Sequence, residues 1–271
     1  MNQFKTTIVT VFVDIHKLQN DGYPHRNCNY ITESSKFLLQ LSAPMIIFVE
    51  KHNADKIKYI RSGFGYDHLT RIQVFEFEKL QTSSHIQQLE KLYEMKKHKN
   101  TVFHYSPHYV ATVNAKQEFL KIAMRLTTTG YLMWLDFGIG KRDYDITING
   151  PKILYILSNP KQNISYAIIS PKWNSEDKDG FLWIAAGGLI TVPNTLETQI
   201  FLDYWQTTFV KLLQESVYPL EEYILFKFWK EHPRVVDVFY ANYNILALKY
   251  YGNFSPEEAK KKRQEVLLEQ S

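Results

Sequence analysis

Short apolar runs alternate with longer amphipathic stretches along the first half of the chain, a pattern typical of α/β proteins. Apolar and β-branched runs at residues 6–15 and 44–50 predict two buried strands. Residues 34–41 lie between them and have helical spacing. A strand, a helix and a second apolar strand indicate a parallel βαβ unit. A short helix at 55–61 and a third strand at 71–77 continue the series.

The chain is organised around residues 131–140, whose sequence is YLMWLDFGIG. This run predicts a buried strand that reaches one carboxylate, Asp136, and breaks on Gly138 and Gly140. A capped amphipathic helix over 114–128 leads directly into it. The carboxyl ends of strands are where open α/β sheets bind their ligands. An aspartate at that position also serves as a turn former or cap, so the pattern alone leaves both interpretations open.

The second half predicts shorter and more mixed elements. A hairpin or edge pair at 153–157 and 165–169 is followed by a strand within 181–193 that contains the small residues Ala185 to Gly188. Glycines at such a position permit close approach of a backbone or ligand, or mark a bulge. The remaining predicted elements are helices at 194–214 and 219–231, a strand at 234–240 and a terminal helix from Ser255.

Length and composition narrow the class of protein. With 271 residues, 45% hydrophobic and 22% charged, the chain can bury a full core in one compact unit. The net charge is +4, and the lysine runs at 96–99 and 260–263 lack interleaved aromatics, which indicates solvated helix faces rather than a nucleic-acid surface. The single cysteine, Cys28, excludes an internal disulfide and suits a reducing compartment. No signal peptide or run of ~18 apolar residues is present, so we expect a cytoplasmic protein without a transmembrane helix.

Several enzyme motifs are missing from the sequence. It contains no GxGxxG after the first strand, no GxxxxGK[ST], no HExxH and no GxSxG. These absences argue against a Rossmann dehydrogenase, a P-loop enzyme, a zincin and an α/β-hydrolase. His104 and His108 have the spacing of helical zinc ligands, but Pro107 between them disfavours a helix, so we expect no metal there.

The order of these segments resembles one family. The first strand, the two arginines Arg61 and Arg71, the NAKxxFLxxA helix, the WLDFG strand and the WIAAGG segment resemble the HtrL/YibB family. More distantly, the chain is similar to nucleotide-sugar glycosyltransferases of the GT-A fold. The resemblance implies a Rossmann-like, mainly parallel sheet flanked by helices, with a smaller antiparallel part on the acceptor side. It implies a single domain over 1–271, with a nucleotide-binding half at about 1–140, an acceptor half at about 141–250 and a terminal helix at 255–271.

The resemblance also implies a function and its site. A hexose would pass from a nucleotide sugar, with UDP as the expected nucleotide, to a hydroxyl of a glycan or of a lipid- or protein-linked sugar. Asp136 matches the first acid of an Asp-x-Asp motif that holds Mn²⁺ or Mg²⁺, whose Lewis acidity neutralises the diphosphate. Gly138 replaces the second acid, so Asp143 or His232 would complete the ligands.

Further roles follow from the same resemblance. Donor-binding residues would come from the end of the first strand, from basic residues, from the helix before WLDFG and from the small-residue loop: Thr10, Phe12, Asp14, Arg61, Arg71, Lys116, Ala186, Gly187 and Gly188. Glu221 or Glu222 would be the general base of an inverting enzyme. These acids also complement the dipole of a helix start, Phe12 also suits a core position, and Arg61 a plain surface charge.

Two other functions fit the same sequence. One is a protein that keeps the fold and donor binding but has lost transfer, as the missing second acid suggests. The other is a nucleotidyltransferase-like enzyme, although the chain offers no glycine-rich NTP loop. Neither the donor sugar, the acceptor, the stereochemistry nor the oligomeric state follows from the sequence.

Overall fold

In the computed structural model, residues 4–18, 31, 37–97, 106–139, 146–168 and 185–240 are described. Their strands form one sheet of seven in the order β3-β2-β1-β4-β6-β5-β7. The strands are β1 (Thr6–Phe12), β2 (Met45–Glu50), β3 (Thr70–Phe75), β4 (Tyr131–Leu135), β5 (Ile164–Ile168), β6 (Ala185–Pro193) and β7 (Val236–Tyr240). The α-helices are α1 (Ile15–Leu18), α3 (Lys51–Gly63), α4 (Ile86–Lys97), α5 (Pro107–Asn114), α6 (Lys116–Leu126), α7 (Ile146–Ser158), α8 (Leu196–Gln214) and α9 (Glu221–Glu231). Short 3-10 turns occupy Asp67–Leu69, Phe77–Lys79 and Thr82–His85.

The sheet joins a parallel half to an antiparallel one. β1 pairs in parallel with β2 and β4, and β2 with β3. β6 runs antiparallel to both β4 and β5, while β7 is parallel to β5. The carboxyl ends of β1, β2 and β4 therefore share one edge of the sheet, and the start of β6 lies beside the end of β4, where Leu135 pairs with Leu189. This arrangement confirms the predicted mainly parallel sheet with a smaller antiparallel part.

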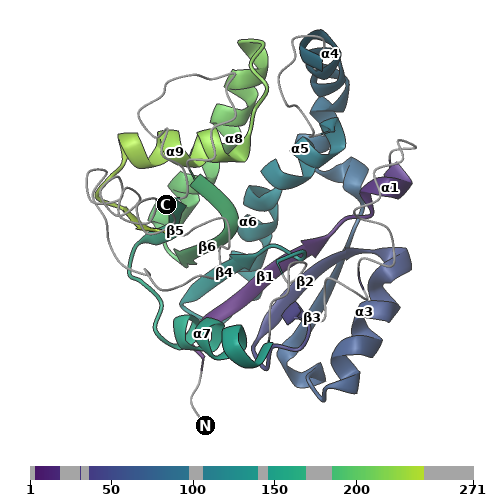
Figure 1. Cartoon of the computed structure of the whole chain (residues 1–271), viewed down its shortest axis with the longest axis vertical. Coiled ribbons are helices and arrows are strands. Elements are labelled where there is room, and N and C mark those ends of the chain that lie inside the picture. The colour runs from purple at the N-terminus through teal and green to yellow at the C-terminus, as the bar shows by residue number, and fades with distance from the viewer. Residues whose placement is uncertain are drawn as a thin grey trace, which may run out of the picture.

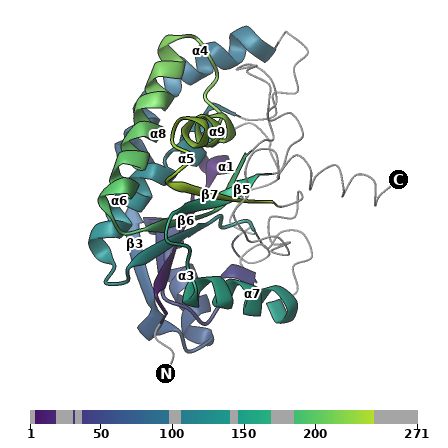
Figure 2. The same cartoon turned by 90° about the vertical axis from the view of Figure 1, so that its left-hand side faces the viewer.

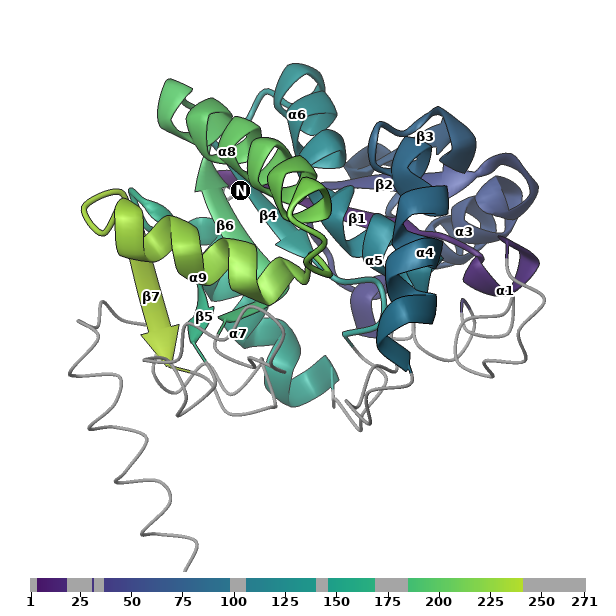
Figure 3. The ribbon, with the colours of Figure 1, turned by 90° about the horizontal axis from the view of Figure 1, so that it is seen from above.

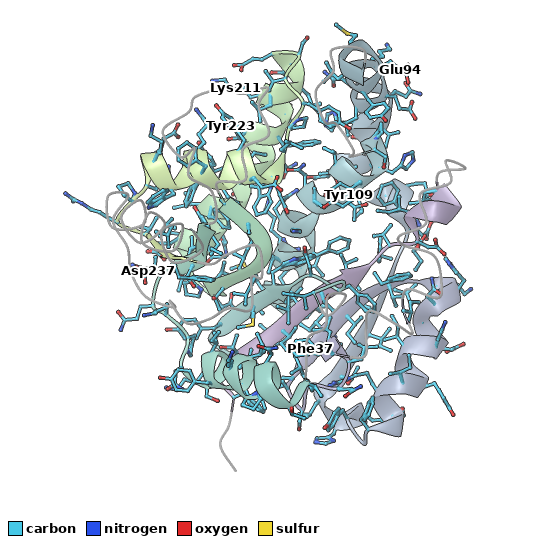
Figure 4. All side chains as sticks on the ribbon, viewed as in Figure 1. Phe37, Glu94, Tyr109, Lys211, Tyr223 and Asp237 are labelled. Carbon is cyan, nitrogen blue, oxygen red and sulfur yellow. The ribbon has the colours of Figure 1, made fainter. Side chains whose placement is uncertain are left out.

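Helices cover both faces of the sheet, as Figure 1 shows, with α4, α5, α8 and α9 above the strands and α3 and α7 below them. In Figure 2, turned by a quarter, α6 and α8 lie together on one side. The upper core includes Trp134, Phe119 and Trp205, all at most 1% exposed. A second core on the opposite face includes Phe37, which Figure 4 shows near α7. Burial on both faces explains why the central strand β4 and its neighbour-but-one β2 are almost entirely apolar.

One predicted strand is wrong. Residues 153–157 lie inside α7, where Ile153, Ile156 and Leu157 are buried and Tyr155 is 66% exposed. Their spacing places the three buried side chains on one helical face, and a short apolar run alone does not distinguish a helix from a strand. A second difference concerns Pro107, which begins α5 as its first residue, a position where the missing N–H is not needed.

The predicted helix at 34–41 lies partly outside the described residues. The other predicted elements within these ranges agree with the structure to within a few residues at their ends. The predicted terminal helix 255–271 and the loop residue Asp143 lie outside the described residues. No helix in the described part of the chain is long and apolar enough to cross a membrane.

Candidate functional site

Four segments that are distant in sequence meet at the carboxyl edge of the parallel half. They are the start of α6, the residue after β4, the start of β6 and the start of α9. Figure 3 shows α9 lying across the β6 side of the sheet, beside α8, and α9 packs on β6. The α9 start is held there by Asn114, whose amide donates to the carbonyls of Val110 and Pro219, both at 2.9 Å. The amide oxygen of Asn114 accepts from Nε1 of Trp205 on α8.

Lys116 is the first residue of α6 and stands at the centre of this meeting point. Its side chain is 3% exposed. The ammonium nitrogen Nζ lies 3.0 Å from Oδ1 of Asp136 and 2.7 Å from Oε2 of Glu221. It also donates to the carbonyl of Gly187 at 2.9 Å and to Oε1 of Glu221 at 3.0 Å. The two carboxyl groups raise the pKa of Lys116 despite its burial, so it is a buried cation at neutral pH.

Asp136 follows β4 directly and is oriented by three contacts. Its backbone N–H donates to the carbonyl of Gly188 at 2.9 Å, which ties the end of β4 to the start of β6. Its Oδ1 accepts from Nε1 of Trp134 at 2.7 Å and from Lys116. The side chain is nevertheless 41% exposed. Asp136 therefore has one oxygen, Oδ1, fixed inside the protein, whereas Oδ2 takes part in none of these three contacts.

Gly187 lies against the carboxyl group of Glu221. A Cβ at position 187 would stand 2.7 Å from both Cδ and Oε2 of Glu221, closer than real Cβ contacts occur. A residue with a side chain at 187 would therefore displace Glu221 from Lys116. The predicted close approach at this glycine is made by the protein's own carboxyl group.

Glu221 and Glu222 begin α9 but sit in different surroundings. Glu221 is 5% exposed, and burial raises its pKa to about 8, against the opposing effect of Lys116. Glu222 is only partly buried, and desolvation raises its pKa to about 7. A carboxyl group with a pKa near the working pH suits proton transfer. Of the two, Glu222 is the one with access to solvent.

The end of β1 contributes a neighbouring group at the same edge. Asp14 follows β1, its N–H donates to Oε2 of Glu50 at 2.8 Å, and its Oδ2 lies 3.8 Å from Nε2 of His52. Thr10 and Phe12 are 0% and 2% exposed. The ring of Phe12 packs on that of Phe137, with 5.1 Å between the ring centroids. Phe12 is therefore a core residue, as the alternative interpretation of the sequence proposed.

The two arginines lie at the opposite, amino edge of the sheet. Arg61 is fully buried and donates to the carbonyls of Leu39, Leu41 and Ala43, which precede β2, and to Thr70. Its guanidinium holds this connection in place and does not face the Asp136 edge. Arg71, at the start of β3, is exposed and donates to the carbonyl of Leu126. Neither arginine is brought to the Lys116 and Asp136 cluster.

His232 is also separated from the cluster. It follows the last residue of α9, whereas Glu221 is the first, and eleven residues of α-helix span roughly 16 Å. The imidazole packs on Tyr204 and Phe228 instead. His232 and Asp136 therefore do not form a joint metal site.

The described residues do not fit the metal site that the resemblance implied. No group of three or more His, Cys, Asp or Glu that could hold a metal ion occurs among them. Gly138 offers no ligand, and Oδ1 of Asp136 already accepts two hydrogen bonds.

The sequence did not indicate that Lys116 and Glu221 form a buried pair, or that Trp134, Asn114 and Trp205 support it. The two members of the pair are 105 positions apart. A partial signal was available in Lys116 itself, a charged residue among the apolar positions of the helix that enters the central strand.

Comparisons with known proteins agree with this architecture. A family model described as "Bacterial protein of unknown function (HtrL_YibB)" matches residues 4–179, which confirms the resemblance seen in the sequence. No curated protein matches the chain.

The solved structures that the chain resembles include glycosyltransferases and also 4-diphosphocytidyl-2C-methyl-D-erythritol synthase from Anaerococcus prevotii, which is 9% identical, with 97% of this chain and 100% of that chain covered at a TM-score of 0.42. Core-mannan synthase A from Aspergillus fumigatus, in its Mn/GDP form, is 9% identical, with 87% of this chain and 73% of that chain covered at a TM-score of 0.54. Mouse xyloside xylosyltransferase 1 is 9% identical, with 86% of this chain and 84% of that chain covered at a TM-score of 0.47. Galactosyltransferase LgtC, in complex with donor and acceptor sugar analogues, is 13% identical, with 87% of this chain and 73% of that chain covered at a TM-score of 0.46. At these identities the likeness concerns the fold, which is the GT-A fold.

Proposed function

The chain belongs to the HtrL_YibB family, and within its GT-A fold we propose that it is a glycosyltransferase that passes a hexose from a nucleotide sugar to a hydroxyl acceptor. The observation that carries this proposal is the cluster of Lys116, Asp136, Gly187 and Glu221 at the carboxyl edge of β1 and β4. Open α/β sheets bind ligands at that edge. A buried and partly neutralised acid cluster is costly to maintain, which favours a role in a site over a role in stability alone.

The donor would lie across this edge. Asp136 would accept a hydrogen bond from a hydroxyl of the ribose or the sugar through Oδ2. The segment Ala186 to Gly188 would hold Asp136 in place beneath the donor, through the carbonyl of Gly188. Asp14, beyond β1, would face the nucleoside. UDP is the nucleotide we propose, and GDP is the first competitor to test because core-mannan synthase A, which the fold resembles at a TM-score of 0.54, was solved in a GDP form.

Glu222 would be the general base. The oxygen of the acceptor hydroxyl would form a bond to the anomeric carbon while the bond from that carbon to the diphosphate oxygen breaks. The hydroxyl proton would pass to the Glu222 carboxylate, and the nucleoside diphosphate would leave. A pKa of about 7 places this group where both its protonated and deprotonated forms are populated under physiological conditions.

A donor-binding protein without transfer activity is the second candidate. It is favoured by one observation, the engagement of Asp136 by Lys116 in the absence of a second acid at Gly138. The two candidates share donor binding and differ only in turnover.

Donor binding is tested by thermal unfolding with UDP, GDP, CMP and their sugars, because a ligand that binds only the folded state raises the Tm. We expect one nucleotide class to stabilise the wild type and Asp136→Ala to lose most of that shift. Asp203→Ala on the exposed face of α8 is the matched control and should respond like the wild type. Absence of any shift would refute both candidates.

Transfer is then tested by release of the nucleoside diphosphate with candidate glycan acceptors. Turnover that depends on Glu222 supports the proposal that the protein is a glycosyltransferase. Binding without release of the diphosphate under any acceptor identifies the second candidate.

A further inference from the structure

The ammonium group of Lys116 has an unusual set of neighbours for a buried lysine. Four oxygens surround it: one carbonyl oxygen from Gly187, two carboxyl oxygens from Glu221 and one from Asp136. They come from three separate segments of the chain and lie at 2.7–3.0 Å from Nζ. The ring of Trp134 adds an aromatic wall at 5.6 Å.

A shell of carboxylate and carbonyl oxygens is the environment that a hard divalent cation takes in proteins. The distances show whether the shell has the size for a divalent metal ion or for an ammonium group. Metal–oxygen bonds are about 2.0–2.6 Å, whereas a charge-assisted N–H···O bond is about 2.7–2.9 Å. The shell around Nζ has the second spacing, which is the one expected while an ammonium group occupies the position.

The charge of Lys116 also acts against a metal at the accessible oxygen. Oδ1 and Oδ2 belong to one carboxylate, so an ion on Oδ2 would sit close to the buried ammonium, which is only 3.0 Å from Oδ1. Two cations at such a separation repel each other, and because the ammonium group is buried, salt screens this repulsion only in part. Asp136 is thus partly neutralised before any ligand arrives.

We propose that the ammonium of Lys116 occupies the cation position of this site, so that Asp136 acts without a divalent metal and binds the donor through a hydrogen bond from a hydroxyl to Oδ2. The part concerning the donor rests on the proposed function. The part concerning the metal rests on the geometry alone.

The metal part is tested without any nucleotide. Mn²⁺ and Mg²⁺ are titrated into the wild type, Asp136→Asn, Lys116→Ala and Lys116→Met, and the Tm of each is recorded. Lys116→Ala empties the oxygen shell, whereas Lys116→Met removes the same charge but fills the space with an apolar chain, so it is the matched control. We expect Mn²⁺ at ten times its dissociation constant to raise the Tm of Lys116→Ala by about 3–6 °C and to leave Lys116→Met unchanged.

The wild type supplies the decisive comparison even if Lys116→Ala fails to fold. No Mn²⁺ shift, or a shift that is the same in Asp136→Asn, supports the proposal, since any ion then binds elsewhere. A Mn²⁺ shift in the wild type that Asp136→Asn abolishes overturns it. A folded Lys116→Ala that ignores Mn²⁺ also overturns it, because the shell would then not be a cation site.

Nucleotide binding is measured afterwards in EDTA and in Mn²⁺. Equal stabilisation by the nucleotide sugar in both solutions supports metal-free donor binding. Stabilisation that requires Mn²⁺ and Asp136 overturns the inference while leaving the proposed function intact. Failure of all nucleotides to bind refutes the proposed function, and the metal titrations without nucleotide remain interpretable.

Discussion

Gly187→Ala is the sharpest single perturbation of the site. The added methyl group would stand 2.7 Å from Cδ and Oε2 of Glu221, so one of the two must move. Overpacking of a buried position costs about 1–3 kcal/mol. Separation of Glu221 from Lys116 would add part of the roughly 3–5 kcal/mol that breaking a buried charged contact costs. We expect a total loss of about 2–4 kcal/mol in the free energy of unfolding, and ~4–16 °C in the Tm.

The measurement is urea or thermal unfolding beside a matched glycine. Gly130→Ala is the control, because a Cβ there meets nothing within 4 Å, and it should change the stability by less than about 1 kcal/mol. In a Glu221→Ala background the methyl group has no carboxyl group to meet, so the cost of Gly187→Ala should shrink to that of the control. An equal effect of Gly187→Ala and Gly130→Ala, or an undiminished cost in the double variant, would refute the reasoning.

Three further predictions concern other parts of the molecule. Glu222 must be deprotonated to act as a base, so the transfer rate should rise with pH through about 7. Glu222→Gln should flatten that rise and lower kcat about 10²-fold or more. If the variant keeps the same rise with pH, Glu222 is not the base. Arg61→Met leaves three buried carbonyls without their donor and should lower the free energy of unfolding by about 3–5 kcal/mol, measured in urea. Arg71→Met, at an exposed position, should lower it by less than about 0.5 kcal/mol. Equal losses would contradict the structural role assigned to Arg61. Asn114→Leu removes the hydrogen bonds to Val110, Pro219 and Trp205 and should lower the free energy of unfolding by about 2–4 kcal/mol in the same measurement. Unchanged stability would contradict the role assigned to Asn114.

The sheet was predictable because local composition determines buried strands. The runs that became β2 and β4 are apolar at nearly every position, as strands covered on both faces are, and the run that became β1 has β-branched residues at six of its seven positions. The same rule failed for residues 153–157, since a run of five apolar residues fits a buried strand and one face of a helix equally well.

The site was predictable only in outline. Asp136 was identified because a strand ends at it, and strand ends are local features of the sequence. The pairing of Lys116 with Glu221 depends on how α6 and α9 pack, which no local pattern states. Arg61 shows the reverse case: its helix was predicted, but the direction of its side chain, into the carbonyls before β2, follows from tertiary structure.

The distance in sequence between Lys116 and its partner Glu221 has a consequence for synthesis of the chain. A ribosome that adds 5–20 residues per second needs roughly 5–20 s to cover the 105 positions between them. During that interval Lys116 can emerge and α6 can dock on β1 and β4 while the carboxyl group that shares its burial does not yet exist. A newly made amino-terminal half therefore offers Lys116 the carboxylate of Asp136 but not that of Glu221, and the start of α9 completes the burial only when almost the whole described fold has been made.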